Sequence, residues 1–90
     1  MGTALVKIKI LPASTEIDLE KLKETIKSLI EGKGGKNCNI EEEPIAFGLV
    51  ALVPSFAWPE EKELEVLEGE MNRLEEVSSI QIVDMRRAIG

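Results

Sequence analysis

The stretch Ile45-Ala-Phe-Gly-Leu-Val-Ala-Leu-Val53 is almost wholly apolar and lies between two prolines, Pro44 and Pro54. A run of this length, bounded by turn residues, is typical of a strand whose two faces are both covered. We therefore expect Ile45–Val53 to form a central strand of a sheet. Because proline lacks the backbone N–H that the next ladder bond requires, we expect this strand to end or bulge at Pro54.

Three predicted elements precede this strand. Thr3–Leu11 alternates between apolar and polar side chains, which predicts a strand with one buried face. Asp18–Ile30 repeats leucine and isoleucine at spacings of three and four, which predicts a helix with Asp18 as its N-cap. Lys36–Glu43 is short and polar, as suits a strand at the edge of a sheet.

Two predicted elements follow the central strand. Glu61–Leu74 places leucine and methionine three and four residues apart, which predicts a second helix. Ser78–Asp84 alternates and predicts a last strand, after which Met85–Gly90 forms a tail. The order β-α-β-β-α-β predicts an α+β ferredoxin-like sandwich, in which a four-stranded antiparallel sheet carries both helices on one face. Right-handed crossovers would place the first and third strands in the middle.

Length and composition exclude several classes of protein. The chain has 90 residues, so we expect a single domain over residues 1–90. With no His and one Cys, a disulfide framework, a structural zinc site and a Ser/His/Asp or Cys/His triad are all excluded. We find neither a signal peptide nor an apolar run long enough to span a membrane. We expect a cytoplasmic protein without a metal or cofactor.

The charge is acidic and unevenly distributed. The chain has 11 Lys and Arg against 17 Asp and Glu, a net charge of −6, and the excess lies in Glu60–Glu76. An acidic chain is poorly suited to bind nucleic-acid phosphates or an anionic membrane, so we expect neither as a direct partner. We interpret Glu60–Glu76 as the solvent face of the second helix, with an acidic docking surface for a basic partner as the alternative.

The aromatic residues provide the first candidate site. Composition alone favours a core position for Phe47, but Gly48 beside it has no side chain and would let a partner's backbone approach the ring. Phe56 and Trp58 follow Pro54, and we expect them in a loop, as a hydrophobic lid or an exposed patch. An RNA-recognition sheet needs exposed aromatic residues on both central strands, and the first strand has none.

The polar candidates are weaker. Arg86 and Arg87 form either a basic tip that reaches carboxylates or phosphates on a partner, or a solvated terminus. Glu41-Glu42-Glu43 would alternate in direction along a strand, so we interpret them as a solvated edge rather than a magnesium site. Cys38 has little positive charge beside it, which favours a small apolar filler over a reactive thiol. The glycine-rich segment 32–35 follows a helix and predicts a turn, not a phosphate loop.

Two motifs carry a family resemblance. Pro44-Ile-Ala-Phe-Gly-Leu49 resembles the Pro-Ile-x-Phe-Gly-[Ile/Leu] signature of the exchange domain of translation elongation factor 1-beta. Val77-Ser-Ser-Ile-Gln-Ile-Val-Asp-Met-Arg-Arg87 resembles the C-terminus of that family, and Ile8-Lys-Ile-Leu-Pro12 resembles its archaeal, stand-alone form. The resemblance covers the whole chain in element order and length. It implies the ferredoxin-like fold and a function as guanine-nucleotide exchange factor for elongation factor 1-alpha, the GTPase that brings aminoacyl-tRNA to the ribosome.

The resemblance also implies the residues that contact the GTPase. The Phe that packs against the GTPase in eukaryotic relatives corresponds to Phe47, with Gly48 next to it. A Lys that reaches into the GTPase's Mg²⁺ site corresponds by position to Arg87, and the adjacent Arg86 is the other candidate. Arginine keeps the charge but replaces a compact ammonium with a planar guanidinium. None of these residues needs to act as an acid, base or nucleophile, so we expect a monomeric exchange factor that is not an enzyme.

Other functions share this fold. A small-molecule-sensing or oligomerising regulatory domain is the main alternative, and it would form a stable dimer without the GTPase. An acylphosphatase-type enzyme needs an Arg in the loop after the first strand, and Pro12-Ala-Ser-Thr15 has none. A metal chaperone of this fold needs a Cys-x-x-Cys motif, which is absent.

Overall fold

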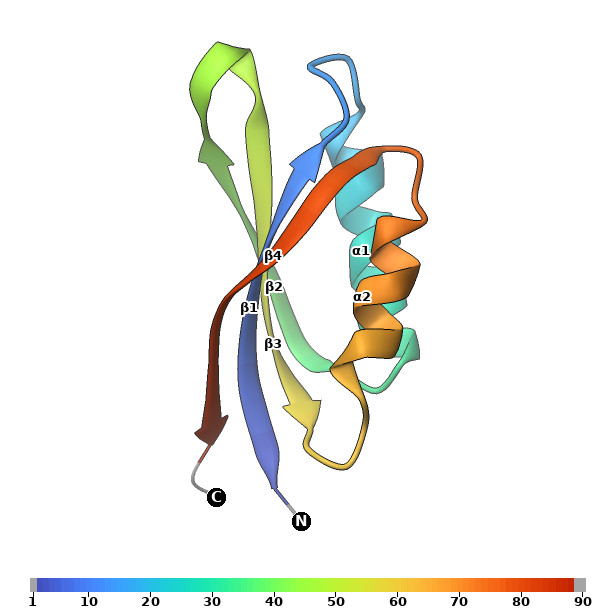
Figure 1. The fold of residues 1–90 in the computed structure, drawn as a ribbon, viewed down its shortest axis with the longest axis vertical. Coiled ribbons are helices and arrows are strands. Elements are labelled where there is room, and N and C mark those ends of the chain that lie inside the picture. The colour runs from blue at the N-terminus through green and yellow to red at the C-terminus, as the bar shows by residue number, and fades with distance from the viewer. Residues whose placement is uncertain (1, 89–90) are drawn as a thin grey trace.

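The computed structural model describes residues 2–88 and has the predicted order of elements (Figure 1). They are β1 (Thr3–Pro12), α1 (Leu19–Gly32), β2 (Lys36–Pro44), the short 3-10 helix η1 (Ala46–Gly48), β3 (Val50–Pro59), α2 (Leu64–Asn72) and β4 (Val77–Ala88). The strands form one antiparallel sheet in the order β2-β3-β1-β4, and both helices lie on the same face of it. The ferredoxin-like prediction is confirmed, with the first and third strands in the middle.

The core lies between the two helices and one face of the sheet. Every second residue of β1 points into it, as the alternation predicts. Apolar residues three or four positions apart on each helix meet this face. The buried side chains from these three elements are Ala4, Val6, Ile8, Ile10, Leu22, Ile26, Ile30, Leu64, Leu67 and Met71. The opposite face of the sheet carries neither helix, and it is the face toward which Leu5 and Lys7 point.

The boundaries predicted for β3 were wrong. The strand begins at Val50 rather than Ile45, and it continues through Pro54 to Pro59. Pro54 pairs with Ile40 of β2, and the register with β1 is the same on both sides of the proline. One missing donor therefore does not displace the strand, because the ladder bonds on either side of it fix the register.

The longer strand also corrects the prediction for two aromatic residues. Phe56 and Trp58 are not in a loop: both point from β3 into the core, at 3% and 2% exposure. Their rings are 6.0 Å apart in an edge-to-face arrangement, which is a favoured geometry for aromatic pairs. The Trp58 indole N–H donates to the Lys62 carbonyl at 3.1 Å, so its polar atom is satisfied.

The last strand is longer than predicted. β4 runs from Val77 to Ala88, so Met85, Arg86 and Arg87 are not a tail but pair with Val6, Leu5 and Ala4 of β1. The rest of the predicted tail, 89–90, lies outside the described residues. Among the described residues, no helix is long and apolar enough to cross a membrane.

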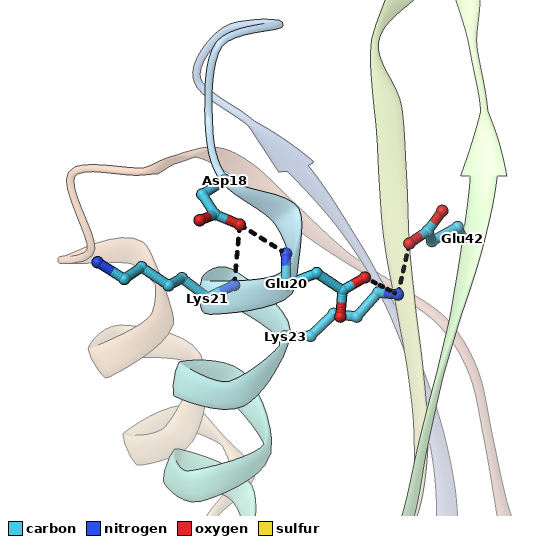
Figure 2. Close-up of polar contacts among 5 residues, drawn as sticks. All are labelled: Asp18, Glu20, Lys21, Lys23 and Glu42. Atoms are coloured by element: carbon cyan, nitrogen blue, oxygen red, sulfur yellow. Dashed lines mark hydrogen bonds and ion pairs between the residues drawn. The ribbon is translucent and has the colours of Figure 1, made fainter.

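The start of α1 is fixed by side-chain contacts (Figure 2). The Asp18 carboxylate accepts from the backbone N–H groups of Glu20 and Lys21 at 3.1 and 3.3 Å, which confirms the predicted N-cap. One turn later, Lys23 lies between Glu20 and Glu42, so it connects the helix to β2. The hydrogen bond to Glu42 is the main cause that raises the pKa of Lys23 above its ordinary value.

Removal of this cap gives a first testable prediction. Asp18→Ala leaves two N–H groups of the first turn without their side-chain acceptor, and we expect it to lower the free energy of unfolding by about 1 kcal/mol. Urea denaturation followed by circular dichroism measures this change. Asp18→Asn, which keeps an acceptor oxygen, is the matched control and should lose less than half as much. Equal stability of the alanine variant and the parent would contradict the capping role.

Candidate functional site

Phe47 lies at the tip of the β2–β3 connection, and 94% of its surface is exposed. The interpretation of Phe47 as a core residue was therefore wrong. The connection folds back on itself through a hydrogen bond from the Ile45 N–H to the Leu49 carbonyl, 2.8 Å long. Phe47 and Gly48 lie side by side in the left-handed region, with φ of 63° and 76°. Two consecutive residues of positive φ turn the chain tightly at this tip, where the ring is left exposed.

The conformation of Phe47 costs free energy and gains no packing in the isolated chain. A glycine tolerates positive φ without penalty, whereas an ordinary residue loses about 1–2 kcal/mol there. Burial of the ring could offset such a cost, but this ring is almost fully in water. A strained backbone that displays an apolar ring is a feature expected of a contact surface. Beside it is a shallow cavity of about 340 Å³ lined in part by Leu11, Leu49 and Gln81.

Arg86 and Arg87 lie at the far end of β4 and point to opposite faces of the sheet. Arg86 pairs with Leu5, and its guanidinium contacts Asp84 at 2.9 Å. Arg87 pairs with Ala4, a core residue, so it points to the helix-bearing face. There its Nε donates to Glu60 Oε2 at 2.8 Å.

A β-bulge decides which arginine lies on which face. The register shifts between the Lys7–Asp84 and Ile8–Ile82 pairs, which makes Val83 an extra residue on β4. Ile80 and Ile82 pair with core residues of β1 and therefore lie on the helix side. Strict alternation from them would place residue 86 on the helix side and residue 87 on the opposite side. Because Val83 is an extra residue, the alternation after it is reversed, and Arg87 lies on the helix-bearing face instead.

The structure does not bring the two halves of the candidate site together. Phe47 and Gly48 are at the β2–β3 end of the sheet, whereas Arg86 and Arg87 are at the end where both chain termini lie (Figure 1). The distance follows from the register along β1: Arg87 pairs with Ala4 near its start, whereas the β2–β3 connection lies beyond Leu52, which pairs with Ile10 near its end. Eight residues of strand at about 3.3 Å each separate these ends by roughly 26 Å. The long axis of the molecule measures 41 Å, so the two groups mark its ends.

The remaining polar candidates behave as structural groups. Glu42 and Glu43 form ion pairs with Lys23 and Lys9, and Glu41 is exposed, in keeping with a solvated edge. In residues 2–88, no three Cys, Asp or Glu side chains lie close enough to hold a metal ion. Gly32 is the last residue of α1, and residues 33–35 form the turn after it, where the Gly35 N–H donates to the Ile30 carbonyl at 2.8 Å.

Cys38 gives a second testable prediction. Burial is the main cause that raises the pKa of its thiol above the ordinary 9.0, and the nearby carboxylate of Glu31 adds to the effect. A raised pKa in the folded state means that stability is full below the unfolded pKa and falls as the pH rises above about 9. We expect the native thiol to react with a thiol-specific disulfide reagent at pH 8 several-fold more slowly than the urea-unfolded thiol. Equal rates in the two states would contradict this assignment.

Glu60 is a residue of the site that the sequence patterns do not reveal. The sequence predicts it on the acidic face of the second helix, but α2 begins only at Leu64, so Glu60 lies in the turn after β3 and contacts Arg87. Its backbone N–H donates to the Gly2 carbonyl at 3.0 Å, which places it beside the start of β1 and the end of β4. A proline followed by a glutamate at the end of a strand is the signal that could have separated Glu60 from the helix.

Comparison with known proteins supports the family that the two motifs resemble. A family model described as "EF-1 guanine nucleotide exchange domain" matches residues 5–88. The chain is 43% identical over 88 residues to "Elongation factor 1-beta" of Methanosphaera stadtmanae, with 97% of this chain and 98% of the relative covered. It is 39% identical over 87 residues to "Elongation factor 1-beta" of Methanococcus maripaludis strain C5, with 94% and 97% covered. It is 38% identical over 89 residues to the protein of that name from Methanocaldococcus jannaschii, with 98% and 100% covered. On this evidence, the chain belongs to the EF-1 guanine nucleotide exchange domain family.

Proposed function

We propose that this protein promotes GDP release and GTP loading on elongation factor 1-alpha during translation elongation. Membership in the exchange-domain family and the name "Elongation factor 1-beta" of its archaeal relatives support this proposal. The protein acts by binding and carries out no covalent chemistry. In keeping with this, its candidate residues are an exposed ring and two arginines rather than an acid, base or nucleophile.

The observation that carries the proposal is the display of Phe47. A ring that is 94% exposed on a strained turn is pre-organised to enter an apolar pocket, because no part of the chain must move to uncover it. Aromatic anchors in pockets dominate many protein interfaces. Gly48, which has no side chain, leaves room next to the ring for the partner's backbone.

The distance between Phe47 and Arg87 indicates how the protein would contact the GTPase. Two contacts roughly 26 Å apart on a rigid sheet require a partner that is touched at two separate places. We assign the apolar anchor to Phe47 and the nucleotide-directed contact to Arg87. The anchor supplies binding energy, and the guanidinium competes for the phosphates and the metal site of the GTPase. The Arg87 contact lowers the affinity of the GTPase for GDP. By linkage, bound GDP lowers the affinity of the GTPase for the exchange factor by the same ratio.

Release of a fluorescent GDP analogue tests the proposal. Purified archaeal elongation factor 1-alpha is loaded with the analogue and Mg²⁺, and release is followed after addition of excess unlabelled GTP, with and without this protein. We expect a release rate that rises with the concentration of the protein and then saturates. The same rate with and without the protein would refute the proposed function. Serum albumin at equal concentration controls for nonspecific effects on the fluorophore.

A further inference from the structure

The Arg87 side chain is held at one end only. In the part of the chain that the structure describes, its guanidinium makes one hydrogen bond within the protein, from Nε to Glu60 Oε2. The side chain as a whole remains 78% exposed. A bond at Nε restrains the stem of the side chain and leaves the terminal fork of the guanidinium directed away from it. The fork is the part that makes bidentate contacts with phosphates and carboxylates.

The Glu60 carboxylate is itself confined, because its side chain is only 29% exposed. Its backbone is tied to β1 through the hydrogen bond to the Gly2 carbonyl. Its second oxygen, Oε1, lies against Gly2 so closely that a Cβ at that position would overlap with it. The carboxylate therefore occupies the space that the missing side chain of Gly2 leaves. Glu60 joins three strand ends in this way: it follows β3, contacts the start of β1 and bonds to the end of β4.

We propose that Glu60 is a positioning residue for Arg87, and that Gly2 provides the space in which the Glu60 carboxylate lies. This inference rests on the proposed function, in which Arg87 acts on the nucleotide site of the GTPase. Glu60 limits the rotamers of a long side chain on an edge strand, so less conformational entropy is lost when the guanidinium enters the partner. The adjacent Arg86 is bound by Asp84 on the opposite face through both Nε, at 3.0 Å, and a terminal nitrogen, at 2.9 Å, so part of its fork is already occupied, whereas among the described residues Arg87 is bound through Nε alone.

Three variants separate the positioning role from a general effect of charge. Glu60→Ala removes the acceptor, and Glu60→Gln keeps an oxygen that accepts from Nε while removing the charge. Gly2→Ala changes neither partner, but its Cβ displaces the carboxylate, and a flexible side chain can move without disturbing the fold. Glu61→Gln removes the same charge from the neighbouring exposed position and is the matched control.

The exchange assay with fluorescent GDP provides the first readout. We expect Glu60→Ala and Gly2→Ala to lower the maximal release rate about fivefold, with the half-saturating concentration unchanged. Glu60→Gln should retain about half of the parent rate, and Glu61→Gln should match the parent. A loss of fold would instead raise the half-saturating concentration and lower the melting temperature, so it is distinguishable from lost positioning.

Nuclear magnetic resonance provides a second readout that does not depend on the GTPase. The chain contains three arginines, so the Nε–H signals are few. We expect the Arg87 Nε–H to exchange with water more slowly than that of Arg73 in the parent, and as fast as that of Arg73 in Glu60→Ala and Gly2→Ala.

The outcomes separate the two proposals. Parent-like release by Glu60→Ala and Gly2→Ala, together with slow release by Arg87→Ala, overturns the positioning role and leaves the proposed function in place. Faster release by Glu60→Ala also overturns it, since Glu60 would then restrain Arg87. Parent-like release by Arg87→Ala overturns the role of Arg87 in the proposed function, and the inference fails with it.

Discussion

Phe47→Ala should weaken the complex with elongation factor 1-alpha about thirtyfold and leave the stability of the free protein nearly unchanged. The ring is 94% exposed in the isolated chain, so its removal costs no core packing. In the complex, loss of a buried aromatic anchor costs about 2 kcal/mol or more, which corresponds to about thirtyfold in affinity. Titration of the GDP release rate against the concentration of the variant measures the effect as a shift in the half-saturating concentration, at an unchanged maximal rate.

The control for this variant is Val66→Ala. Val66 lies on α2 and is also an exposed apolar residue, at 51%. Its truncation removes a smaller amount of exposed apolar surface from a different part of the molecule, and we expect the half-saturating concentration to stay within about twofold of the parent value. Equal effects of the two variants would mean that Phe47 contributes only general hydrophobicity. A Phe47→Ala protein with a much lower melting temperature would show that the ring packs in the free chain.

Arg87→Ala should have the opposite kinetic effect: about the same half-saturating concentration and a maximal release rate reduced about twentyfold, within the usual range of coupling between sites. In the proposed mechanism, the guanidinium acts on the nucleotide site and contributes less to overall affinity than the apolar anchor. Arg87→Lys keeps the charge but loses the fork and the Nε bond to Glu60, so we expect an intermediate rate. Stopped-flow measurement at saturating factor determines all three rates.

Two further variants make the assignment to Arg87 specific. Arg86→Ala removes the neighbouring guanidinium on the opposite face, and Arg73→Ala removes the same charge near the end of α2. We expect both to keep at least half of the parent rate, since one nucleotide pocket can receive a side chain from only one face of β4. A slow Arg86→Ala protein beside a normal Arg87→Ala protein would exchange the roles of the two residues.

The fold was predictable because its signals are local and repeated. The elements are predicted by alternation in β1, by apolar spacing in the helices and by the Asp18 cap. Their order, β-α-β-β-α-β, is typical of one common architecture. The errors in β3 have a physical cause. Pro54 is a strong stop signal on its own, but two neighbouring strands hold the register on both sides of it. The strand-ending tendency of Pro54 is outweighed by hydrogen-bonded pairing along the rest of β3. Because the strand continues past Pro54, Phe56 and Trp58 lie in the core and not in a loop.

The candidate site was less predictable than the fold. The family motifs single out Phe47 and the arginines, but the full exposure of the ring depends on the turn at Phe47 and Gly48, where a non-glycine residue adopts positive φ. The faces of Arg86 and Arg87 depend on one extra residue, Val83, and no pattern in β4 marks it as a bulge. The contact of Glu60 with Arg87 joins positions 27 residues apart in sequence, a distance over which local patterns carry no information.

The two irregular positions of β4 have a consequence for how the protein behaves at high concentration. β4 is an edge strand, and Ile82, Val83 and Met85 on it are exposed, a combination that invites strand-to-strand aggregation. The register against β1 shifts twice, near Val83 and again near Ser78, so the free edge is bent rather than straight. A second molecule could not form an uninterrupted ladder along such an edge. The irregularity that turns Arg87 toward Glu60 therefore also makes the free edge of the sheet a poorer template for pairing with a second molecule.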